Sequence, residues 1–243
     1  MHRLLLCCLI GLGLPAGLAG AAAEPQQPKV APAPPRQEGD GPFSQLILRN
    51  ATVINGTGAP AFGPADIVIA GNRIVQVMSV GSPGGVKEAP NRPKLAAGGR
   101  EIDLRGHYVM PGLIDMHAHI GGEEQGVPAT YVYKLWMGHG VTTIRDPGCG
   151  NGVEWCVSEE KRSERNEITA PRIFPYAFFE PQTPLTKPEE GRRWVRDMKA
   201  KGAVGMKCFG YRPEVLEAVF DELKKQGTIW RSEERRVGKE CRS

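Results

Sequence analysis

Short apolar runs recur along the second half of the chain and alternate with segments that have a helical period. The runs 108–114, 141–144, 172–179 and 204–209 have the length and composition of buried strands. Strands that alternate with helices usually form a parallel sheet joined by crossover helices. From Gly112 onward the pattern therefore predicts an α/β fold with four parallel strands.

Two of the intervening helices have clear ends. Residues 186–189, TKPE, match a capping box and lead into a helix with one apolar face that stops at Gly202. Pro213 opens the second helix, which carries an apolar stripe and stops at Gly227.

Residues 43–110 have a different texture, which predicts a β-sandwich-like subdomain. The apolar runs 67–69 and 74–77 flank Gly71 and Asn72, a pair that tolerates the positive φ of a hairpin turn. The runs 46–48 and 52–54 are expected to be further strands, and the Gly- and Pro-rich stretch 81–99 a surface loop.

The first 42 residues predict export. Residues 1–23 combine Arg3, a short apolar core and a small-residue end, the pattern of a secretory signal peptide. The core is interrupted and too short to span a bilayer, so no membrane attachment is expected after cleavage. Residues 24–42 are Pro-rich and predict a solvated linker. The expected location is secreted or periplasmic.

The last segment, residues 231–243, has one aliphatic side chain and no apolar period, and it resembles translated sequencing-adapter DNA. A native basic tail is the alternative. The tail contributes +2 and Arg3 contributes +1 to the formal net charge of +4, which leaves +1 for residues 24–230. The basic balance is therefore no evidence for nucleic-acid binding.

Three cysteines remain once the signal peptide and the tail are set aside. Cys149 and Cys156 could close a small disulfide loop in an exported chain, although the spacing is not diagnostic. Cys208 is expected to pack as a small apolar residue.

The stretch 111–119, PGLIDMHAH, carries the strongest chemical signal. His117 and His119 follow a strand and project from the same face, as two ligands of a metal site would. A polar loop with two incidental histidines is the alternative. Asp115 lies two residues before His117 and is expected to project from the same face, where it can orient a metal ligand. The alternative is that backbone N–H groups bind its carboxylate. Arg145 and Asp146 end the next strand and can line the pocket. The alternative is an ordinary ion pair or a turn formed by Asp-Pro-Gly.

At this motif the sequence resembles the amidohydrolase superfamily, in its imidazolonepropionase-like and Xaa-Pro dipeptidase-like branch, from about Leu46 to Gly227. The resemblance implies the first half of a (β/α)8 TIM-like barrel at residues 111–230, with Lys207 as a carboxylated ligand that bridges two metal ions. It also implies two more histidines and a catalytic aspartate on later strands. The last histidine here is His139. The barrel is thus expected to be incomplete after its fourth strand, with no catalytic residue assigned and with poor folding and no activity for this chain.

The resemblance implies a metal-dependent hydrolase that cleaves carbon–nitrogen bonds, chiefly of non-peptide amides, through a metal-bound hydroxide. His117, His119 and Lys207 would hold one or two divalent ions, with zinc favoured. A Xaa-Pro dipeptidase-like hydrolase is one alternative, and a non-catalytic remnant or binding module is another. The expected partner is a small amide or dipeptide substrate. Nucleic acid is not expected, and an oligomer is compatible with the sequence.

Overall fold

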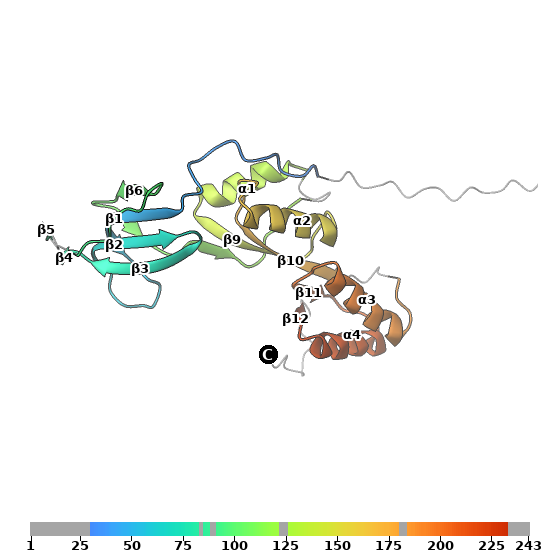
Figure 1. Ribbon diagram of the computed structural model, residues 1–243. Coiled ribbons are helices and arrows are strands. Elements are labelled where there is room, and N and C mark those ends of the chain that lie inside the picture. Colours follow the sequence, from blue (N-terminus) through green and yellow to red (C-terminus); the bar gives the residue numbers. More distant parts are fainter. Residues whose placement is uncertain (1–29, 83–84, 88–90, 122–125, 180–183, 233–243) are drawn as a thin grey trace, which may run out of the picture.

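The computed structural model describes residues 30–82, 85–87, 91–121, 126–179 and 184–232. Two sheets follow one another along the chain, and helices accompany the second (Figure 1). The predicted signal peptide lies outside the described residues, as does residue 233 onward. Within the described residues, no helix combines the length and apolarity that crossing a membrane requires.

The N-terminal sheet is built around β1 (Gln45–Val53), which joins the two strands predicted at 46–48 and 52–54. Its pairing with β2 shifts register between Leu48 and Ala51, where Asn50 has a φ of 60°. The predicted hairpin is confirmed, with Gly71 at a φ of 56° in its turn. The other strands are β2 (Phe62–Ala70), β3 (Arg73–Ser79), β6 (Arg100–Asp103) and β7 (Tyr108–Val109).

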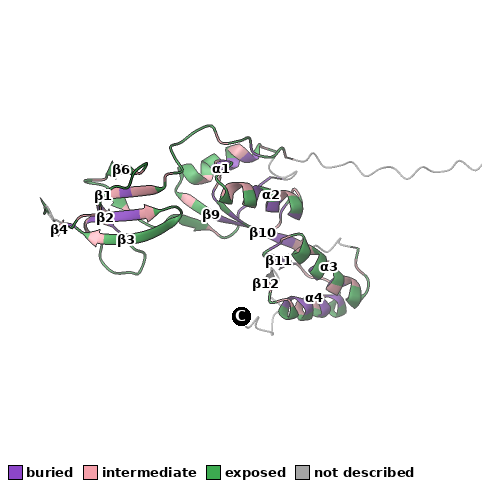
Figure 2. Ribbon diagram, viewed as in Figure 1, coloured by how far each residue is buried: buried purple, intermediate pink, exposed green. Residues whose placement is uncertain are grey.

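This sheet has the order β3-β2-β1-β6, with β7 also paired to β1. Part of the predicted surface loop forms a small ribbon, β4 (Gly81–Ser82) with β5 (Gly85–Val86). Among the described residues no second sheet layer packs on the five-stranded sheet, and β3 is mostly exposed (Figure 2). The described part is therefore a single sheet whose edge strand β3 is solvated.

The second sheet is parallel throughout, in the order β12-β11-β10-β9-β8, and curls as half of a barrel. Its strands are β8 (Leu113–Asp115), β9 (Val141–Asp146), β10 (Arg172–Phe179), β11 (Gly205–Cys208) and β12 (Ile229–Ser232). The expected end after the fourth strand is wrong, because β12 adds a fifth. It includes Arg231 and Ser232, the first two residues of the segment predicted to be a non-native tail.

The predicted strand 108–114 is divided between the two sheets, since β7 pairs with β1 and β8 pairs with β9. Pro111 interrupts it because proline has no N–H to donate. Gly112 then lies so close to β9 that a Cβ there would be 1.9 Å from Oγ1 of Thr142. Leu113 and Ile114 are 51% and 60% exposed, contrary to the prediction of a buried strand. In the described residues β8 has a neighbour only at β9, so its side chains are not enclosed.

Four helices follow the strands in the part of the chain that the structure describes: α1 (Ala129–Gly138), α2 (Val153–Glu164), α3 (Pro188–Ala200) and α4 (Pro213–Lys225). Both predicted helices are confirmed as α3 and α4. The capping residue of α3 is Glu190 and not the predicted Glu189, because Oε2 of Glu190 accepts the N–H groups of Thr186 and Lys187 at 2.7 and 3.0 Å. The helices bury apolar side chains against one face of the parallel sheet.

The described part of the predicted linker, residues 30–42, is partly buried. Ala33 is 4% exposed and packs in the cluster that holds α1 to the sheet. Its N–H donates to Oε2 of Glu159 at 3.2 Å, and its carbonyl accepts from Arg162 at 2.6 Å. The proline-rich segment therefore lies along α2 as an extended strap.

Candidate functional site

The register of the parallel sheet divides its side chains between two faces. Ala177, Phe179, Met206 and Cys208 pack in a cluster with residues of α2, α3 and α4. Since side chains alternate along a strand, the residues between them point to the opposite face. In a curled sheet that face is the concave one, and in a barrel the reactive groups lie where its strands end.

His117 and His119 lie in the loop directly after β8, and their ring centroids are 5.1 Å apart. His117 is exposed and His119 is half-buried. Ala118 between them is 2% exposed, and its N–H donates to the carbonyl of Arg145 at 3.0 Å. Burial of alternate residues in the core thus leaves both imidazoles on the outer side of the loop, near the end of β9.

Lys207 lies on β11 and is 7% exposed. Its ammonium is 5.0 Å from the ring centre of Phe209 and 5.3 Å from that of Phe178. Strands β9 and β10 lie between β8 and β11. In a flat sheet this places β11 roughly 14 Å from β8, and the curl of the sheet shortens that distance. Lys207 thus stands on the same sheet as the histidine pair but apart from it.

Asp115 accepts the N–H of His117 at 2.9 Å, so it sets the turn that starts the histidine loop. Asp146 is fully buried and connects three backbone groups. Oδ1 accepts the N–H groups of Gly148 and Cys149 at 3.0 and 2.8 Å, and Oδ2 accepts that of Ile120 at 3.2 Å. Asp146 therefore ties the histidine loop to the loop after β9.

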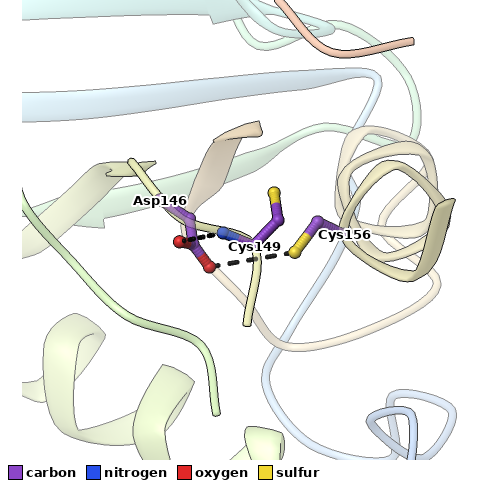
Figure 3. Close-up of side chains that lie close together, drawn as sticks. All are labelled: Asp146, Cys149 and Cys156. Carbon is purple, nitrogen blue, oxygen red and sulfur yellow. Dashed lines mark hydrogen bonds between the residues drawn. The ribbon is translucent and has the colours of Figure 1, made fainter. Parts of the chain in front are cut away.

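Asp146 also belongs to a compact cluster with Cys149 and Cys156 (Figure 3). The donor atoms of the three residues lie within 4.8 Å of one another, and Sγ of Cys156 is 3.8 Å from Oδ2 of Asp146. A hydrogen bond to Cys149, burial and the nearby carboxylate all raise the pKa of Cys156. Protonated thiols are poor metal ligands, and the Asp146 oxygens already accept backbone N–H groups. The cluster therefore acts as a structural anchor.

The cysteines of the described residues are all free, so the disulfide predicted between Cys149 and Cys156 is not formed. Cys208 is fully buried in the apolar cluster, as predicted, and burial raises its pKa to about 12. His107 and His139 each place Nδ1 near a local backbone carbonyl, at 3.1 and 2.7 Å, so both side chains make local structural contacts.

Arg145 is the site residue whose role the sequence did not reveal. The expected ion pair is absent: within the described chain Arg145 has no carboxylate partner, and its Nε and Nη2 are buried without a hydrogen-bond partner. Its recorded side-chain contact is the ring of Tyr176, whose centroid is 5.2 Å from Cζ. A single arginine within an apolar strand was the only available signal.

No family model matches the chain, but comparisons with known proteins find similar sequences and similar folds. The chain is 29% identical over 136 residues to an adenine deaminase of Geobacillus kaustophilus (strain HTA426), covering 52% of this chain and 23% of that protein. It is 28% identical over 136 residues to an N-acyl-D-aspartate deacylase of Alcaligenes xylosoxydans xylosoxydans, with coverages of 56% and 24%.

Among solved structures, a Xaa-Pro dipeptidase with methionine bound in its active site superimposes with a TM-score of 0.60 and 21% identity, covering 78% of this chain and 56% of that one. The chain thus spans about a quarter of these curated relatives and about half of this solved structure. Over that part, the sequence matches and the curled parallel sheet are similar to those of the amidohydrolase superfamily.

Proposed function

We propose that the chain carries the metal-binding strands of an exported hydrolase that cleaves carbon–nitrogen bonds of small molecules. The observation that carries the proposal is the pair of imidazoles, 5.1 Å apart, at the end of β8. In barrels of this class, reactive groups gather where the strands end. The names of the similar proteins, a deaminase, a deacylase and a dipeptidase, all refer to carbon–nitrogen bonds.

The residues of the loop fit a divalent ion. Imidazole nitrogen suits zinc, and both rings lie at the accessible side of an anchored loop. His117 and His119 would hold the ion, while Asp115 and Asp146 fix the backbone on either side of them. A bound ion of this kind supplies an activated water and polarises the carbonyl under attack.

Lys207 fits a bridging role less directly. An ammonium near two phenyl faces is favoured by the negative potential of those faces, and a carbamate would give up that attraction. We propose that Lys207 is an ammonium in the metal-free chain and becomes a ligand only when metal is bound. The resemblance assigns the remaining metal ligands to strands later than β12.

The substrate is proposed to be a non-peptide amide. A Xaa-Pro dipeptide is the second candidate, because the dipeptidase structure shares the fold over 78% of this chain. The proposed export rests on residues 1–23 of the sequence alone. The sheet around β1 is proposed to be one layer of a sandwich-like subdomain, since β3 leaves a largely exposed apolar side.

Zinc analysis of the purified 243-residue chain tests the proposal. The wild-type chain should retain zinc after dialysis, and His117→Ala and His119→Ala should lose it. His139→Ala is the matched control, because His139 bonds the carbonyl of Leu135 at the end of α1 and should not affect zinc. Equal zinc content in wild-type and His117→Ala chains would refute the site.

A further inference from the structure

Arg145 is a buried cation that the described chain does not neutralise. It is 8% exposed, two of its guanidinium nitrogens have no hydrogen-bond partner, and no ion pair of the described residues includes it. A buried charge is normally paired because removing it from water is costly. Its position therefore indicates a ligand that supplies the missing negative charge.

Neighbouring strands fix where this cation lies. Tyr176 on β10 packs directly over Gly205 on β11, where a Cβ would be 2.3 Å from Cε1 of the tyrosine ring. The missing side chain at Gly205 lets the ring lie against the sheet, and Arg145 on β9 stacks on that ring. Contact with a ring face does not satisfy the N–H groups of a guanidinium, so they still need an acceptor.

Arg145 is also adjacent to the histidine pair. Its own carbonyl accepts the N–H of Ala118, the residue between His117 and His119. The parallel register places its side chain on the face opposite the helices, which is also the face of Lys207. A ligand that reached the histidine pair across this face could therefore meet the guanidinium.

We propose that Arg145 binds the carboxylate of the substrate and restricts the enzyme to amides that carry one, such as N-acyl amino acids and dipeptides. This inference rests on the proposed function. Two parallel N–H groups match the two oxygens of a carboxylate, and charge-assisted pairs of this geometry are among the stronger hydrogen bonds. A neutral amide or nucleobase would leave the buried charge unpaired, and the site would disfavour it.

Calorimetry tests this proposal. It measures the binding of N-acetylglycine and of its neutral analogue N-acetylglycinamide to the 243-residue chain, with and without zinc. The wild-type chain should bind N-acetylglycine at least about tenfold more tightly than N-acetylglycinamide, the difference in affinity expected from one charge-assisted pair. Arg145→Met should reduce the preference to about twofold or less, with Arg145→Lys in between. The matched control is Arg172→Met, since Arg172 is an exposed arginine at the start of β10, and it should keep the full preference.

An equal preference in wild type and Arg145→Met, or no preference in wild type, would overturn the inference. If Arg145→Met does not fold, the NMR signals of the Arg145 side-chain N–H groups in the wild-type chain decide the question. A shift of these signals on adding N-acetylglycine supports the inference, and no shift overturns it. His117→Ala separates the two proposals. If the His117→Ala chain loses zinc but still binds N-acetylglycine more tightly than N-acetylglycinamide, the carboxylate site stands independently of the zinc site.

Discussion

At the residue scale, Asp146 shows how one buried carboxylate can hold two loops together. It is fully buried, and it accepts N–H groups from both the histidine loop and the loop after β9. Neither loop has regular structure to hold it at these positions. The placement of the histidine pair therefore depends on a side chain that lies behind it.

Replacing Asp146 with Asn should lower the free energy of unfolding by about 2 kcal/mol, because an amide has one acceptor oxygen for donors that two oxygens now serve. Urea unfolding followed by circular dichroism measures this. Asp115→Asn is the comparison, since Asp115 is half-buried and its recorded bond is to one N–H group, so a loss under about 1 kcal/mol is expected. Equal losses for the two variants would contradict the anchoring role.

At the element scale, α3 begins with a charged cap. Oε2 of Glu190 accepts the N–H groups of Thr186 and Lys187 and the hydroxyl of Thr186. These hydrogen bonds hold the pKa of Glu190 below its ordinary value of 4.5. Because the folded chain binds this proton more weakly than the unfolded chain, the cap stabilises the fold above pH 4.5 and loses its effect as pH falls through the lowered pKa.

The Glu190→Gln variant should therefore be less stable than wild type at neutral pH, and the difference should vanish at acid pH, where both side chains are neutral. Urea midpoints of both chains over a pH series measure this. Glu189→Gln removes a charge from the same helical turn without the cap bonds and should show little of this pH dependence. A difference between wild type and Glu190→Gln that persisted unchanged at acid pH would exclude the charged cap.

Element positions were largely predictable because they depend on local pattern. The bounds of β10 and the start of α4 match their predictions, since β-rich composition and a proline at the first turn act locally. The division of 108–114 was not predictable, because it depends on the contact between Gly112 and Thr142 on another strand. The approach of His117 to His119 followed from parity, whereas the unpaired state of Arg145 depends on every neighbour that surrounds it.

At the scale of the whole molecule, residues 30–42, which begin the described chain, contact the helices of the parallel sheet. Arg36 donates its N–H to the carbonyl of Glu167 at 2.7 Å, and Lys134 on α1 pairs with Glu38 at 2.8 Å. Composition alone predicted a solvated linker at residues 24–42, because the six prolines among polar residues there cannot form a core of their own. The small side chain of Ala33 instead completes a core made by other elements.

This strap should contribute measurably to the stability of the helical half. Ala33 is buried beside Glu159, a carboxylate that is 1% exposed and accepts the Ala33 N–H and the Tyr133 hydroxyl. Ala33→Asp would place a second carboxylate in that buried position and should cost about 3 kcal/mol in urea unfolding. Ala31→Asp adds the same charge two residues earlier at an exposed position and should cost little. Matching urea midpoints for the two variants would show that the strap does not pack against α2 in solution, whereas faster proteolysis within residues 30–42 of Ala33→Asp alone would show that the substitution releases it.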